Sequence, residues 1–173
     1  VQRGSRIVCA YFPTWQSGLE QRDERSISNF LREQEYSFVA DDMPLIEYSF
    51  DIIRFNEEYF LGNLESLKTD FHEESSGLFV GNDVNIHPSA CIETGDGPVL
   101  VDEGARILPF VYVRGPAYIG KHCTIIEGAS VKEYTHLSEG CKVGGEIEAS
   151  IMEQYSNKQH HSFVGHSWVG SWV

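Results

Sequence analysis

The sequence predicts a mainly β protein, a parallel β-helix of six-residue repeats preceded by a small helical segment. Two observations predict it. Aliphatic residues occupy every sixth position over residues 101–143 without a gap. A second position, four residues further along each repeat, holds mainly small or β-branched residues. A period of six fits neither an α-helix nor the simple alternation of a strand, so it indicates a repeat architecture.

Three repeats would form one triangular turn, so that residues eighteen apart lie above one another. The aliphatic series is Val101, Ile107, Val113, Ile119, Ile125, Val131, Leu137 and Val143. The second series is Ala105, Val111, Ala117, Cys123, Ala129, Thr135 and Cys141. We therefore expect Val101, Ile119 and Leu137 to stack inward on one face, with neighbouring strands about 4.8 Å apart.

The period of six continues on both sides of this stretch. The upstream members are Val80, Ile86 and Ile92, and the downstream members are Ile151, Phe163 and Val169, in a phase shifted by two residues after Gly144-Gly145. Between Ile92 and Val101, a Gly- and Pro-containing segment around residues 94–100 breaks the phase, as a loop would.

Residues 1–77 are expected to form a mixed or helical segment, and residues 78–173 the repeat domain. Between Ile46 and Phe71, apolar residues recur at steps of three and four, which predicts an amphipathic helix that Gly62 weakens or splits. The expected elements of the segment are a strand over Arg6–Phe12, a short helix over Arg22–Glu35, this longer helix and a polar linker over His72–Gly77.

Composition excludes several classes of partner. The net charge is −13, and acidic residues outnumber basic ones in both halves, which argues against nucleic acid and anionic membranes. Neither an apolar run of about 20 residues nor a signal peptide is visible, so we expect a cytoplasmic protein. Cys123 and Cys141 are expected to be buried thiols rather than a disulfide. The chain starts at Val1 without a methionine and ends at Val173 within a repeat, so we expect a fragment of a longer protein.

Three motifs in the repeat domain carry chemistry. They are Pro109-Phe-Val-Tyr-Val-Arg114, Val143-Gly-Gly-Glu-Ile-Glu148 and His160-His-Ser-Phe-Val-Gly165. With them, the chain from Leu78 to Val173 resembles the hexapeptide-repeat acetyltransferase domain of the bifunctional N-acetylglucosamine-1-phosphate uridyltransferase/glucosamine-1-phosphate acetyltransferases, and the sugar nucleotidyltransferase-like proteins related to them.

The resemblance implies a left-handed β-helix that follows a nucleotidyltransferase domain and helices. It also implies a homotrimer with sites at subunit boundaries, a sugar phosphate as acceptor and acetyl-CoA as acyl donor. Before the repeat domain, the glycines are isolated at Gly4, Gly18, Gly62 and Gly77, so this part of the chain has no Gly-rich phosphate loop. Any nucleotide site would therefore lie outside this chain, and Mg²⁺ would be needed only if that part is active.

The resemblance also implies roles for individual residues. His160 stands where the family keeps its general base, and Arg114 stands where an arginine grips the sugar phosphate. Glu148 is a candidate for orienting a ligand or the histidine. Two departures concern the same site: Phe163 replaces the family's tyrosine, and Ser150 stands where a lysine is usual. Lys158 is the candidate that would compensate for that lysine.

Three alternatives stay open. His160 and Arg114 are also typical of ordinary surface residues at the corners of a repeat. His161 and His166, with a third ligand such as His136, resemble the metal site of carbonic anhydrases built on the same kind of β-helix. Finally, the domain would fit a non-catalytic trimerising or regulatory β-helix attached to a nucleotidyltransferase.

Overall fold

The structure is a computed structural model that describes residues 2–3, 6–7, 23, 25–26, 29–30 and 45–173. The chain divides into two compact units, Val1–Leu45 and Ile46–Val173. In the first unit, β1 (Gln2–Arg3) pairs with β2 (Arg6–Ile7) in antiparallel orientation, and residues 25–26 and 29–30 are helical. The rest of the strand expected to Phe12, and of the helix expected over 22–35, lies outside the described residues.

The second unit begins with helix α2 (Asp51–Leu67), followed by the short 3-10 helix η2 (Lys68–Asp70). The carboxylate of Asp51 accepts hydrogen bonds from the backbone N–H groups of Glu47 and Tyr48, at 3.0 and 2.9 Å, which fixes the chain entering the helix. The helix runs through Gly62 without a break. The expected amphipathic helix is confirmed over Asp51–Leu67, which is shorter at both ends than the predicted stretch from Ile46 to Phe71, and the glycine does not split it.

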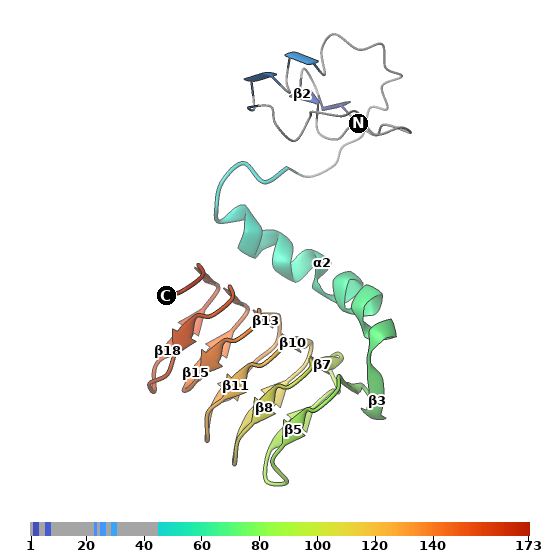
Figure 1. The fold of residues 1–173 in the computed structure, drawn as a ribbon, viewed down its shortest axis with the longest axis vertical. Coiled ribbons are helices and arrows are strands. Elements are labelled where there is room, and N and C mark those ends of the chain that lie inside the picture. Colours follow the sequence, from blue (N-terminus) through green and yellow to red (C-terminus); the bar gives the residue numbers. More distant parts are fainter. Residues whose placement is uncertain (1, 4–5, 8–22, 24, 27–28, 31–44) are drawn as a thin grey trace. The chain divides into compact units, whose positions relative to one another are not determined.

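Three parallel sheets form a β-helix of about five turns (Figure 1). Sheet 1 contains β4 (Leu78–Val80), β7 (Val99–Val101), β10 (Ala117–Ile119), β13 (Thr135–Leu137), β16 (Ile151–Met152) and β19 (Trp168–Val169). Sheet 2 contains β5 (Asn85–Ile86), β8 (Arg106–Ile107), β11 (Thr124–Ile125), β14 (Lys142–Val143) and β17 (Asn157–Lys158). Sheet 3 contains β6 (Cys91–Glu93), β9 (Tyr112–Arg114), β12 (Ser130–Val131), β15 (Glu146–Glu148) and β18 (Phe163–Gly165). An additional strand, β3 (His72–Ser75), pairs antiparallel with β4 at the edge of sheet 1.

The interior of the β-helix is the one that the period of six predicts. Val101, Ile119 and Leu137 pair in register on successive strands of sheet 1 and are fully buried. Every other member of the two series over residues 101–143 is buried as well. Cys123 and Cys141 are buried free thiols, whose Sγ atoms donate to the carbonyl oxygens of Ser138 and Glu153 at 3.0 and 3.1 Å. The expectation for these thiols is confirmed.

Downstream of Val143, two of the three residues in the predicted period, Ile151 and Phe163, do not point into the interior. Met152, not Ile151, pairs with Leu137 and is buried, and Phe163 is 60% exposed on the outer face of sheet 3. The reason is that these turns are shorter than the eighteen residues of three repeats. Val131 pairs with Ile147 and Leu137 pairs with Met152, whereas a strict period of six would place both partners further along the chain. Val169 does pack against the core.

Helix α2 packs on the outer face of sheet 1. Phe60 and Leu64 form a second buried cluster with Leu100 of β7. The Asn56 amide donates to the backbone oxygen of Tyr134 at 2.7 Å, and Glu57 lies 3.3 Å from Nδ1 of His166. The helix and the β-helix are therefore parts of one compact unit, and the boundary expected between residues 77 and 78 falls in the β3–β4 hairpin. No helix among the described residues is long and apolar enough to cross a membrane.

Candidate functional site

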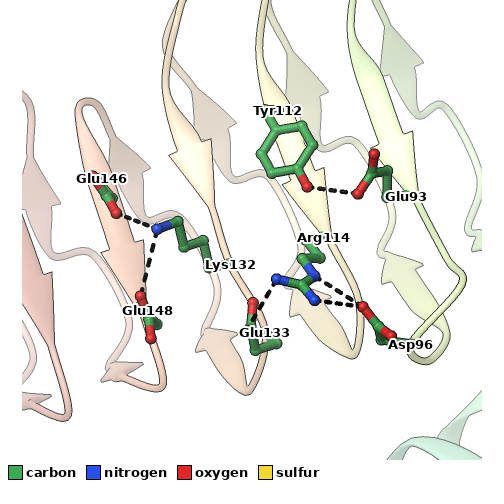
Figure 2. A network of polar contacts seen from close by, with 8 residues as sticks. All are labelled: Glu93, Asp96, Tyr112, Arg114, Lys132, Glu133, Glu146 and Glu148. Carbon is green, nitrogen blue, oxygen red and sulfur yellow. Dashed lines mark hydrogen bonds and ion pairs between the residues drawn. The ribbon is translucent and has the colours of Figure 1, made fainter.

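The outer face of sheet 3 carries a row of charged side chains (Figure 2). Val113, Val131 and Ile147 point inward on successive strands, so the residues that follow them point outward. The register places Lys132 between Arg114 and Glu148. Two predicted site residues, Arg114 and Glu148, therefore lie on one face, about 10 Å apart at two strand spacings.

Arg114 is held by two carboxylates. Its Nε–H and Nη2–H groups donate to Oδ2 of Asp96 at 2.9 and 2.7 Å, and Nη1 lies 3.6 Å from Oε1 of Glu133 (Figure 2). The hydrogen bond with Asp96 and the charge of Glu133 raise the pKa of Arg114. The guanidinium is thus charged and oriented, and its Nε–H and Nη2–H groups are engaged by Asp96.

Lys132 is a member of this face that the motifs did not identify. Its Nζ lies 2.5 Å from Oε1 of Glu146 and 3.6 Å from Oε2 of Glu148, and its pKa is raised, mainly by the hydrogen bond with Glu146. The signal for it was present in the sequence, because Lys132 follows Arg114 by three of the six-residue repeats and therefore by one full turn.

The face as a whole is acidic. The residues drawn in Figure 2 include five carboxylates and two cations. The remaining member, Tyr112, donates its hydroxyl to Oε2 of Glu93 at 2.6 Å, and this bond raises the pKa of the tyrosine. An anionic ligand that approaches Arg114 or Lys132 would have to displace a carboxylate. Glu148, in turn, is oriented by Lys132.

His160 lies in the corner between β17 and β18, at the edge where sheet 2 meets sheet 3. Both His160 and His161 are exposed. The corner packs closely on the preceding turn, because a Cβ atom at Gly145 would lie 2.7 Å from the backbone nitrogen of Ser162 and 2.9 Å from the backbone oxygen of His160. Gly145 has φ +70°, so both space and backbone conformation favour glycine there.

Lys158 holds the backbone of this corner through hydrogen bonds to its carbonyl oxygens. It aligns with Val143 in the inward column of sheet 2. Its ammonium donates to the carbonyl oxygens of Gly144 and Ser162 at 2.6 and 2.7 Å, and more weakly to that of His160 at 3.5 Å. Burial lowers the pKa of Lys158. The structure therefore places Lys158 on backbone carbonyls of the His160 corner.

One curated relative is similar to part of this chain. Bifunctional protein GlmU of Paracoccus denitrificans (strain Pd 1222) is 30% identical over 80 residues, which are 42% of this chain. The chain spans 16% of the length of that relative. This similarity and the parallel β-helix together fit a hexapeptide-repeat β-helix domain. No family model matches the chain, and no solved structure matches it significantly.

Two positions of this hexapeptide-repeat domain depart from the motifs of the family it resembles. Phe163 is exposed beside Glu146 on the outer face of sheet 3, and its ring lies over Gly165, where a Cβ would be 2.4 Å from Cζ. Ser150 is buried in the corner after β15, donates to the oxygen of Glu148 at 2.7 Å and accepts from the N–H of Ser167 at 3.0 Å. Ser150 thus fixes the backbone after Glu148.

The three histidines of the metal-site alternative have separate surroundings within the chain. His136 stacks on Tyr118 with ring centroids 4.8 Å apart, on the outer face of sheet 1. His166 faces Glu57 of α2. Among the described residues, no group of three or more His, Cys, Asp or Glu side chains is arranged to hold a metal ion.

Proposed function

We propose that the β-helix is the acyltransferase-like domain of a sugar nucleotidyltransferase-like protein, acting in nucleotide-sugar biosynthesis. The acceptor is an amino sugar phosphate and the acyl donor is acetyl-CoA. The similarity to Bifunctional protein GlmU supports this proposal, together with the three motifs around Arg114, Glu148 and His160.

The observation that carries the proposal is the gathering of these residues along one side of the β-helix. Arg114 and Glu148 share the outer face of sheet 3, and Phe163 follows on β18 of the same sheet. His160 lies in the corner that leads into β18. The three motifs thereby lie on the turns from β9 to β18, with β12 between Arg114 and Glu148.

In this proposal the neutral imidazole of His160 accepts a proton from the amine as the amine attacks the thioester carbonyl. A nitrogen–carbon bond forms and the carbon–sulfur bond breaks, and the sulfur of coenzyme A takes the proton from His160 and leaves as the thiol. Arg114 binds the phosphate of the acceptor through its planar donor fork. Glu148 orients the acceptor or the histidine, while Lys158 holds the His160 corner in place through its carbonyl contacts.

The assembled protein is proposed to be a homotrimer in which neighbouring subunits complete each site. Phe163, Trp168 and Trp172 are exposed aromatic side chains on the last turns of the β-helix, and they are candidates for the subunit contact. Light scattering on the full-length protein tests this proposal, and a clean monomer would reject it. Mg²⁺ is required only if the full-length protein has an active nucleotidyltransferase domain.

An acetyl-CoA consumption assay on the full-length protein, with a panel of amino sugar phosphates, tests the activity. Turnover with at least one phosphorylated acceptor supports the proposal. No turnover with any of them, together with no binding of acetyl-CoA in calorimetry, would contradict it.

A non-catalytic trimerising or regulatory β-helix is the second candidate. The observation that favours it is the pairing of Arg114 and Lys132 with carboxylates, which leaves these two cations of the face engaged within the chain. Replacement of the family's tyrosine by Phe163 also favours a non-catalytic domain, because the hydroxyl contact is lost. Acetyl-CoA binding separates the two candidates, because only the first requires it.

A further inference from the structure

A loop between β6 and β7 brings a carboxylate to Arg114. Ile92 pairs with Val113, and Val113 pairs with Val131, so the turn that begins at Ile92 is longer than the next one by three positions. The insertion belongs to the loop at residues 94–98. Because of it, Asp96 lies beyond the end of β9 and beside the guanidinium of Arg114 (Figure 2).

The backbone of this loop is packed against the residues that follow Arg114. The N–H of Ala117 donates to the oxygen of Pro98 at 3.1 Å, and the N–H of Gly115 donates to the oxygen of Glu93 at 2.8 Å. A Cβ atom at Gly115 would lie 2.1 Å from the backbone oxygen of Gly97. The loop thus stays next to β9, while the Asp96 side chain, 62% exposed, remains able to rotate away.

We propose that Asp96 is a specificity-determining residue that occupies Arg114 until a phosphorylated ligand displaces it. The inference rests on the proposed function, in which Arg114 binds the phosphate of the acceptor. Carboxylate and phosphate oxygens form the same charge-assisted hydrogen bonds with a guanidinium, so the two compete for Arg114. An exposed ion pair is weak enough to be exchanged.

The competition weakens the binding of every anion, because the apparent Kd is the intrinsic Kd divided by the fraction of molecules in which Arg114 is free. The factor is the same for every anion, so a singly charged ligand, whose hydrogen bonds with the guanidinium are weaker than those of a phosphate dianion, keeps the lower affinity. Glu133, on the other side of the guanidinium, repels every anion that approaches Arg114. A ligand must therefore bind the guanidinium more strongly than Asp96 does, as a phosphate group can.

Titration of the chain with inorganic phosphate, followed by ³¹P NMR line broadening at fixed ionic strength, tests the inference. Asp96→Asn is expected to tighten the apparent Kd about threefold to tenfold. Asp96→Glu keeps the carboxylate and should stay within about twofold of the parent chain. Glu93→Gln is the matched control. Glu93 is the register partner of Arg114 on β6, but its carboxylate accepts a hydrogen bond from Tyr112 and does not contact the guanidinium. Removing its charge should therefore change the Kd by less than about twofold.

The added substitution Arg114→Gln should abolish the gain of Asp96→Asn. Equal gains from Asp96→Asn and Glu93→Gln would overturn the inference, because the effect would then be general electrostatics. A gain that survives Arg114→Gln, or no phosphate binding by any variant, would overturn it as well. Failure of the proposed function gives a different result: no acetyl-CoA turnover, with the Arg114-dependent gain of Asp96→Asn still present.

Discussion

The ammonium group of Lys158 donates to the carbonyl oxygen of Ser162 at 2.7 Å and so closes the corner that contains His160 and His161. This lysine stands in the inward column beside Val143, where the preceding turns have aliphatic residues. Its side chain is partly buried at β17, and backbone carbonyl oxygens accept hydrogen bonds from its ammonium group.

Lys158→Met should destabilise the chain by about 1–3 kcal/mol, because it keeps the apolar stem but removes a charged donor from the carbonyl groups of Gly144 and Ser162. Urea denaturation measures the change. Lys142→Met is the control, since Lys142 is exposed on the neighbouring strand β14 and should change stability by less than about 0.5 kcal/mol. Equal stabilities of the two variants would show that the corner does not depend on the ammonium.

His160→Ala should lower kcat of acetyl transfer by about 10²–10⁴-fold with little change in stability, because a positioned general base contributes that much and the side chain is exposed. His161→Ala is the control and should leave kcat within about twofold, since His161 has no assigned role. Steady-state kinetics with acetyl-CoA and the best phosphorylated acceptor give both values. Loss of activity in His161→Ala alone would assign the base to His161 instead.

The unfolding free energy should fall as the pH drops below about 6.5, in part through His136. Burial lowers the pKa of His136 in the folded chain, so the unfolded chain takes up the proton first. The stability due to neutral His136 is therefore complete above the unfolded pKa and is lost as pH falls towards the folded pKa. The slope from one group is at most about 1.4 kcal/mol per pH unit.

His136→Phe isolates this contribution, because it keeps a ring beside Tyr118 and removes the titrating group. Urea denaturation between about pH 5 and 8 should give a shallower pH dependence for the variant than for the parent chain. Parallel curves would mean that His136 does not couple protonation to folding.

Leu137→Ala should cost about 2–5 kcal/mol, because Leu137 is fully buried between Ile119 and Met152 in the inward column of sheet 1. Ser130→Ala, on the outer face of sheet 3, should cost less than about 0.5 kcal/mol. Chemical denaturation of both variants checks the pair. Comparable losses would indicate that Leu137 is not part of a close-packed interior.

The sequence by itself determined the β-helix and its regular interior. In residues 101–143 each turn has the same length, so a period of six maps directly onto one inward side chain per strand, and burial of Val101, Ile119 and Leu137 followed from spacing alone. The same regularity would have identified Lys132 as a neighbour of Arg114, one turn away. The three site motifs were likewise visible as local runs of residues.

The tertiary structure decided whatever depends on a change of turn length. The shorter turns after Val131 moved Met152 into the interior, aligned Lys158 with Val143 and turned Phe163 outward, since shifting a strand by one residue exchanges its faces. The longer turn after Ile92 brought Asp96 to Arg114. Insertions and deletions in corners change register without leaving a periodic signal, so only the pairing of strands in space shows which charges meet.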